Sequence, residues 1–145
     1  MDRYNNQFAL TLPDGWLDQS SYTFVGPQAG GIQHLLLLNV DNFAGEADLL
    51  TYAYDRIEMI KNSMPDLETL KEGVRTLPSG LEIYEWVFKW TPPGGDTQFR
   101  RIVYMLFNKV GYIFAATFTR QTFKVVGVEV MRMIENFVPG GFKKA

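Results

Sequence analysis

The sequence predicts an α+β fold, in which two helices pack on a mainly antiparallel, twisted sheet of about six or seven strands. Short apolar runs separated by glycine and proline turns indicate the strands, and two stretches with a helical period indicate the helices. A third observation is residues 81–120, where three successive strand-like runs are apolar on both faces. A sheet with one wet face alternates apolar and polar side chains, so both faces of this meander need a cover.

The first three strands follow from alternation and turn residues. Residues 8–12 alternate apolar and polar side chains and end at the Asp14-Gly15 turn. Residues 22–25 form a second short strand, which we expect Gly26-Pro27 to close. Residues 32–40 form a third strand, apolar on both faces and therefore expected near the middle of the sheet.

The period changes to a helical one over residues 47–64, and Pro65 ends this first helix. Its predicted buried stripe consists of Leu50, Ala53, Tyr54, Ile57, Ile60 and Met64. A more polar strand over residues 67–77 follows and leads into the meander.

In the meander, the aromatic row of the first run could be a stacking platform for bases or sugars, but it lacks interleaved basic residues. We therefore interpret it as core under the C-terminal helix; the row is Tyr84, Trp86, Phe88 and Trp90. In the second run the arginine pair Arg100-Arg101 places at least one cation among apolar neighbours. After Arg120 we expect a second helix that continues to about Asn136.

Composition bounds the function. The 145 residues fit a single domain over 1–145, and 46% hydrophobic with 21% charged residues is ordinary for a globular protein. A formal charge of −2 removes the electrostatic reason to expect a nucleic acid or an anionic membrane as partner. The N-terminus is polar and the longest aliphatic run is Leu35–Leu38, so we expect a cytoplasmic protein that does not insert into a membrane.

Residues for catalysis are scarce. Cysteine is absent, which excludes disulfides and thiolate chemistry, and the single histidine, His34, lies in a leucine-rich strand, where a structural role is the simpler interpretation. The carboxylates are scattered, and no glycine pair precedes the lysine of a phosphate loop. We expect a binding protein without enzymatic activity, cofactor or metal.

The N-terminal motif carries a family resemblance. Leu12-Pro13-Asp14-Gly15-Trp16-Leu17-Asp18-Gln19-Ser20, then a leucine-rich strand ending in Val40-Asp41, resembles the DcrB-like domains of the Mog/PsbP-like α/β/α fold. Cytoplasmic members of this length resemble Eag chaperones of type VI secretion. The resemblance implies a homodimer whose apolar sheet face shields the N-terminal transmembrane helices of secreted effectors.

The resemblance also implies which residues bind the client. Carried onto this sequence, the groove comprises Ser21, Thr23, Leu35, Leu37, Arg56, Ile60, Met64, Arg101 and Val103. Arg56 and Arg101 would hold polar groups of the client, and the small hydroxyl side chains Ser21 and Thr23 would make a shallower or more polar groove than aliphatic residues. The leucines, Ile60 and Met64 could equally be core.

Two other interpretations stay open. A PsbP/DcrB-type assembly or regulatory module would be a monomer that closes its second sheet face with its own segments. A small-ligand binder or enzyme with a pocket near His34 would lose its activity when His34 is replaced by alanine.

Overall fold

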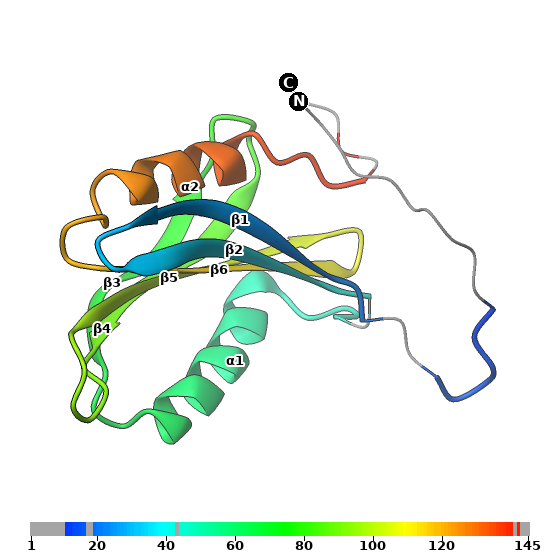
Figure 1. Ribbon diagram of the computed structural model, residues 1–145. Coiled ribbons are helices and arrows are strands. Elements are labelled where there is room, and N and C mark those ends of the chain that lie inside the picture. Colours follow the sequence, from blue (N-terminus) through cyan, green and yellow to red (C-terminus); the bar gives the residue numbers. More distant parts are fainter. Residues whose placement is uncertain (1–10, 17–18, 43, 141, 143–145) are drawn as a thin grey trace.

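A six-stranded antiparallel sheet forms the centre of the molecule in the computed structural model, with one helix on each face (Figure 1). The structure describes residues 11–16, 19–42, 44–140 and 142. The elements are β1 (Ser21–Ala29), β2 (Ile32–Asp41), α1 (Leu49–Ser63), β3 (Glu68–Thr76), β4 (Glu82–Trp90), β5 (Gln98–Phe107), β6 (Val110–Phe118) and α2 (Val126–Glu135). The strand order is β1-β2-β6-β5-β4-β3, which confirms the predicted α+β class.

Tight turns join two pairs of neighbouring strands. Gly30 and Gly31, with φ of 60° and 86°, turn β1 into β2, and Asn108 and Lys109, with φ of 50° and 64°, turn β5 into β6. Two central residues with positive φ give the hairpin turn whose twist matches that of the strands. The connection that contains α1 carries the chain from β2 to β3 at the far edge of the sheet.

Each face of the meander packs against one of the chain's own helices, and the two faces use different helices. Trp86 and Phe88 lie in one core cluster with Tyr52, Ala53 and Ile57 of α1. The opposite face holds a second cluster, in which residues such as Val103 pack with Val130 and other residues of α2. The aromatic row is therefore core, as predicted, but the prediction that the C-terminal helix covers it is wrong, because α1 covers that row.

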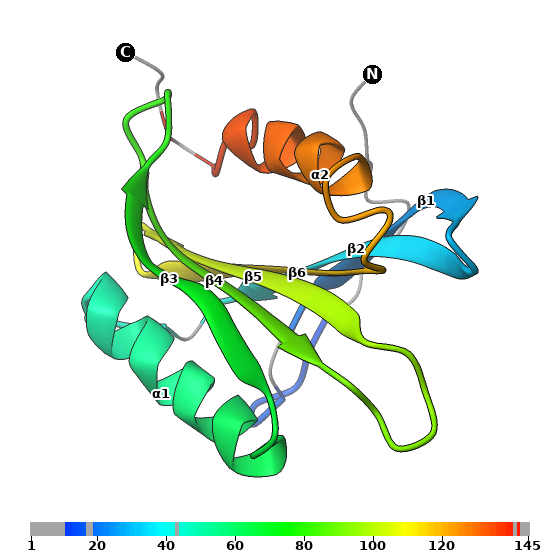
Figure 2. The same cartoon turned by 90° about the vertical axis from the view of Figure 1, so that its left-hand side faces the viewer.

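The two helices are placed diagonally. α1 contacts β4 and β5, whereas α2 contacts mainly β6 on the other face. Figure 2 shows α1 below the β3 side of the sheet, with no helix below β1. Each helix thus leaves part of its own face uncovered, and β1 is exposed along nearly its whole length.

Several predicted boundaries need correction. β1 does not close at Gly26-Pro27, because the strand continues through a register shift between Val25 and Gln28 to the turn at Gly30. α2 begins at Val126 rather than just after Arg120, since residues 121–125 form turns. The strand predicted at residues 8–12 lies largely outside the described residues, and Thr11 and Leu12 are not in a strand.

The buried stripe of α1 also differs from the prediction. Leu50 and Tyr54 are 43% and 49% exposed, while Tyr52 is buried. The Tyr52 hydroxyl donates a hydrogen bond of 2.8 Å to Asp41, and this bond anchors α1 to the end of β2. The apolar pattern did not identify Tyr52 as buried, because a tyrosine can bury its ring while its hydroxyl reaches a polar partner.

Candidate functional site

The part of the α1 face that α1 leaves uncovered forms the candidate site. We call this surface the open half-face and define it by Ser21 and Thr23 of β1, Leu35 and Leu37 of β2, Ala115 and Thr117 of β6, and Arg100 and Ile102 of β5. The register places Thr23, Leu37, Ala115 and Ile102 in one row, which continues to Trp86. Side chains paired across antiparallel strands point to the same face, so this row spans the sheet.

Exposure along that row shows where the cover ends. Trp86 is fully buried and Ile102 is 5% exposed, but Leu37 is 40% exposed, as is Leu35 on the same strand. A concavity of about 260 Å³ lies over this surface and is lined by Leu35, Leu37, Arg100, Ile102, Ala115 and Thr117, among others. The open half-face is therefore a shallow, mainly apolar recess beside the packed core.

Arg100 supplies the positive charge of the recess. Its Nε donates a hydrogen bond of 3.2 Å to the Thr117 hydroxyl, and its guanidinium carbon lies 5.9 Å from the centre of the Phe88 ring. Burial lowers the pKa of this guanidinium, and within the described part of the chain no carboxylate pairs with it. Arg100 can therefore donate hydrogen bonds to a carbonyl or hydroxyl that enters the recess.

The residues predicted on the first helix lie beside the recess rather than in it. Arg56 stacks on Tyr52 at 3.5 Å from the ring centre and forms an ion pair of 3.1 Å with Asp41. Ile60 and Met64 are partly buried against the core under α1. None of these three side chains lines the concavity, so Arg56 has an evident structural role in holding α1 to β2.

Two predicted residues lie on the wrong side of the sheet. Val103 is fully buried in the cluster under α2, and Arg101 forms an ion pair with the buried Glu85 on that same side. Side chains alternate along a strand, so Arg100 and Ile102, their neighbours, are the β5 residues that face the recess. The structure thus brings together Ser21, Thr23, Leu35 and Leu37 but separates Arg101 and Val103 from them.

Sequence reasoning missed Arg100, Ala115 and Thr117 as members of this surface. An available signal was the small size of Ala115 and Thr117 amid larger apolar residues, which makes room beside Leu37. The choice between Arg100 and Arg101 needed the strand pairing itself, because β5 is apolar on both faces.

His34 has a structural environment. It is 3% exposed, its Nδ1 lies 2.9 Å from the Pro27 carbonyl oxygen, and its Nε2 lies 2.8 Å from the Thr122 hydroxyl. Both ring nitrogens are thus engaged in tying β1 to the loop before α2. In the described part of the chain, histidines and carboxylates form no group of three that could hold a metal ion.

No helix in the described ranges combines the length and apolar character needed to cross a bilayer. No protein-family model matches the chain, and no curated protein is similar to it in sequence. Among solved structures, it is similar to PA94 of Pseudomonas aeruginosa, a protein of unknown function, with a TM-score of 0.77 and 19% identity over 97% of this chain and 96% of that one. It is also similar to LpqN of Mycobacterium tuberculosis, which is involved in cell envelope biogenesis, with a TM-score of 0.50 and 9% identity over 79% and 68% of the two chains. At these identities the similarity is one of fold.

Proposed function

We propose that this protein is a non-enzymatic cytoplasmic chaperone or adaptor that binds the apolar N-terminal transmembrane helices of type VI secretion effectors. The observation that supports this function best is the open half-face, where Leu35 and Leu37 remain 40% exposed beside a fully packed core. Exposed apolar surface of this kind is typical of a site for a partner. A lipid-facing helix in water needs such a cover, because each Å² of apolar surface left exposed costs about 25 cal/mol.

The dimensions of the surface suit a helical client. β1 and β2 have 9 and 10 residues, and strands of this length extend roughly 30 Å. The apolar part of a transmembrane helix has about the same length. A client helix that lies along these strands would place its apolar side chains against Leu35 and Leu37.

Polar groups of the client have partners in the recess. Arg100 has no carboxylate partner among the described residues and can donate to a serine, threonine or carbonyl oxygen of the client. The hydroxyl groups of Ser21, Thr23 and Thr117 lie on the same face. The recess is therefore suited to a transmembrane helix that carries small polar residues.

One open half-face covers only one side of a helix. We therefore propose that two copies of the chain enclose the client, as a homodimer. Light scattering after gel filtration should then give the mass of two 16.6 kDa chains plus the mass of one client when a client is bound.

Co-expression with the effector encoded beside its gene tests the function. The wild-type protein should raise effector abundance and co-purify with the effector's N-terminal segment. The variant Leu35→Gln/Leu37→Gln should reduce co-purification about tenfold or more, because the loss of two leucine contacts exceeds about 1.4 kcal/mol.

The matched control is Leu50→Gln/Leu70→Gln, which replaces two leucines of similar exposure, 43% and 44%, outside the recess. This control should bind as the wild type does. Failure of any client to co-purify, or equal losses in both double variants, would contradict the proposed function.

A further inference from the structure

A second open surface lies on the opposite side of the sheet and differs in chemistry. A cleft of about 450 Å³ runs between α2 and the strands β3 and β5. Five cationic side chains line it, and we call it the cationic cleft: Lys71 and Arg75 of β3, Arg101 of β5, Lys124 before α2, and Arg132 of α2. Because β5 alternates its side chains, the cleft and the open half-face lie on opposite faces.

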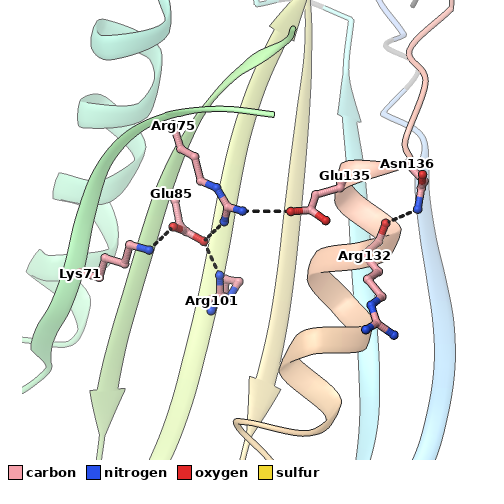
Figure 3. A network of polar contacts seen from close by, with 7 residues as sticks. All are labelled: Lys71, Arg75, Glu85, Arg101, Arg132, Glu135 and Asn136. Atoms are coloured by element: carbon pink, nitrogen blue, oxygen red, sulfur yellow. Dashed lines mark hydrogen bonds and ion pairs between the residues drawn. The ribbon is translucent and has the colours of Figure 1, made fainter. Parts of the chain in front are cut away.

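Carboxylates neutralise only part of this charge. Glu85 is 1% exposed and holds Lys71 at 3.1 Å, Arg75 at 3.7 Å and Arg101 (Figure 3). Glu135 adds a second ion pair to Arg75, at 2.9 Å. Five cations thus face two carboxylates, in a chain whose formal charge is −2.

The excess charge sits on cations that have no ion pair. Within the described ranges, no carboxylate pairs with Lys124 or Arg132, and no dashed line reaches the Arg132 guanidinium in Figure 3. The Nε of Arg101 is buried and has no hydrogen-bond partner, although its side chain lines the cleft. Glu85 therefore leaves one donor of this guanidinium unused.

The wall of the cleft on the α2 side carries apolar side chains between its charged ones. Phe123 and Met131 line it, and Val128 is 47% exposed there. Arginine guanidiniums bind carboxylates with paired hydrogen bonds, and the apolar wall suits aliphatic side chains. The volume of the cleft lies within the range of about 300–1,000 Å³ that is usual for ligand-binding pockets.

We propose that the cationic cleft binds an acidic peptide segment of a partner protein, one that carries aliphatic residues between its carboxylates. The phosphate backbone of a nucleic acid offers nothing to the apolar wall, and the plane of a bilayer does not enter a recess. This site is separate from the client surface of the proposed function and does not depend on it.

Fluorescence anisotropy with a labelled synthetic peptide of glutamates and leucines tests the site. The full-length wild-type protein should bind the peptide at about 50 mM salt and lose affinity as the salt concentration rises, because charge contacts are screened. A peptide with glutamine in place of each glutamate should bind at least tenfold more weakly. The variant Lys124→Glu/Arg132→Glu should also lose at least tenfold in affinity, since it reverses the two cations that have no ion pair.

The matched control is Lys61→Glu/Lys109→Glu, which makes the same change in net charge outside the cleft, at one half-buried and one exposed lysine. It should stay within about twofold of the wild type. Circular dichroism of both variants verifies that they fold. The proposal is overturned if the wild type does not bind the acidic peptide, or if both double variants lose affinity equally. Tighter binding of an oligonucleotide of equal charge, or of phosphatidylserine vesicles, would also overturn it.

Discussion

At the scale of single residues, Glu85 is the group on which most others depend. It is a fully buried carboxylate between three cations, one of which, Arg101, is itself 13% exposed. We predict that Glu85→Gln lowers the free energy of unfolding by about 3–5 kcal/mol, because it leaves the buried guanidinium without its counter-charge. Urea denaturation measures this loss.

The control for this variant is Glu58→Gln, on the exposed side of α1. It should change the free energy of unfolding by less than about 0.5 kcal/mol. A loss of similar size in both variants would show that Glu85 contributes no more than a surface carboxylate.

Gly111 is a second residue with a specific steric role. A Cβ atom at this position would lie 2.1 Å from the Tyr52 hydroxyl oxygen and 2.6 Å from the ring carbon that bears it. We predict that Gly111→Ala destabilises the fold by roughly 1–3 kcal/mol, since the buried ring must move. Gly73→Ala, where no atom lies within 4 Å of the added carbon, should cost nothing measurable in the same thermal melts.

At the scale of elements, α1 begins with a charged cap. The Asp48 carboxylate accepts a hydrogen bond of 2.8 Å from the Thr51 backbone N–H, and this bond lowers the pKa of Asp48. A lowered pKa stabilises the folded state above the carboxyl's unfolded pKa of about 3.9, and the stabilisation is lost as the pH falls through the folded pKa.

We predict that Asp48→Ala lowers the melting temperature at pH 7 and that its difference from the wild type shrinks at pH 3. Asp48→Ser is the control, because a hydroxyl caps the helix without titrating. The difference between the Ser and Ala variants should therefore be the same at both pH values. A wild-type advantage over Ala that persists unchanged to pH 3 would refute the charged cap.

Elements were predictable where local chemistry marks them. Turn residues and alternation located β2 and the meander, and the helical period located both helices, although Asp48, the cap of α1, lay inside the range predicted for the first helix. It was harder to predict from the sequence which face of the sheet each residue lies on. Trp86 and Val87 are both buried, and Glu85, which would mark a solvent-exposed face, is buried as well, so the sequence of β4 does not tell which helix covers which side.

The candidate site shows the same limit. Leu35 and Leu37 were named through the family resemblance, while the alternation of β2 showed only that they lie on the face opposite Leu36 and Leu38. That Arg100 faces the recess and Arg101 does not could not be predicted from the sequence. It depends on the pairing of Arg100 with Thr117 across β5 and β6. That pairing is set by long-range register, which a run that is apolar on both faces does not fix.

At the scale of the whole molecule, the diagonal placement of α1 and α2 separates the two open surfaces by the sheet. We predict that they act independently. Leu35→Gln/Leu37→Gln should leave the affinity for the acidic peptide within about twofold, and Lys124→Glu/Arg132→Glu should leave client co-purification unchanged. The variant that combines all four substitutions should show both losses and no more. If a double variant also weakens binding at the site that it does not alter, the two surfaces are not independent.

The irregular middle of β1 bears on how the protein avoids aggregation. This edge strand exposes Phe24 and Val25, at 49% and 70%, and a regular edge of this kind invites another chain to add a strand. The register shift between Val25 and Gln28 contains Pro27, which has no N–H to donate, so an added strand could not pair along the full edge. The molecule can therefore keep an apolar edge in water while resisting open-ended stacking of sheets into fibres.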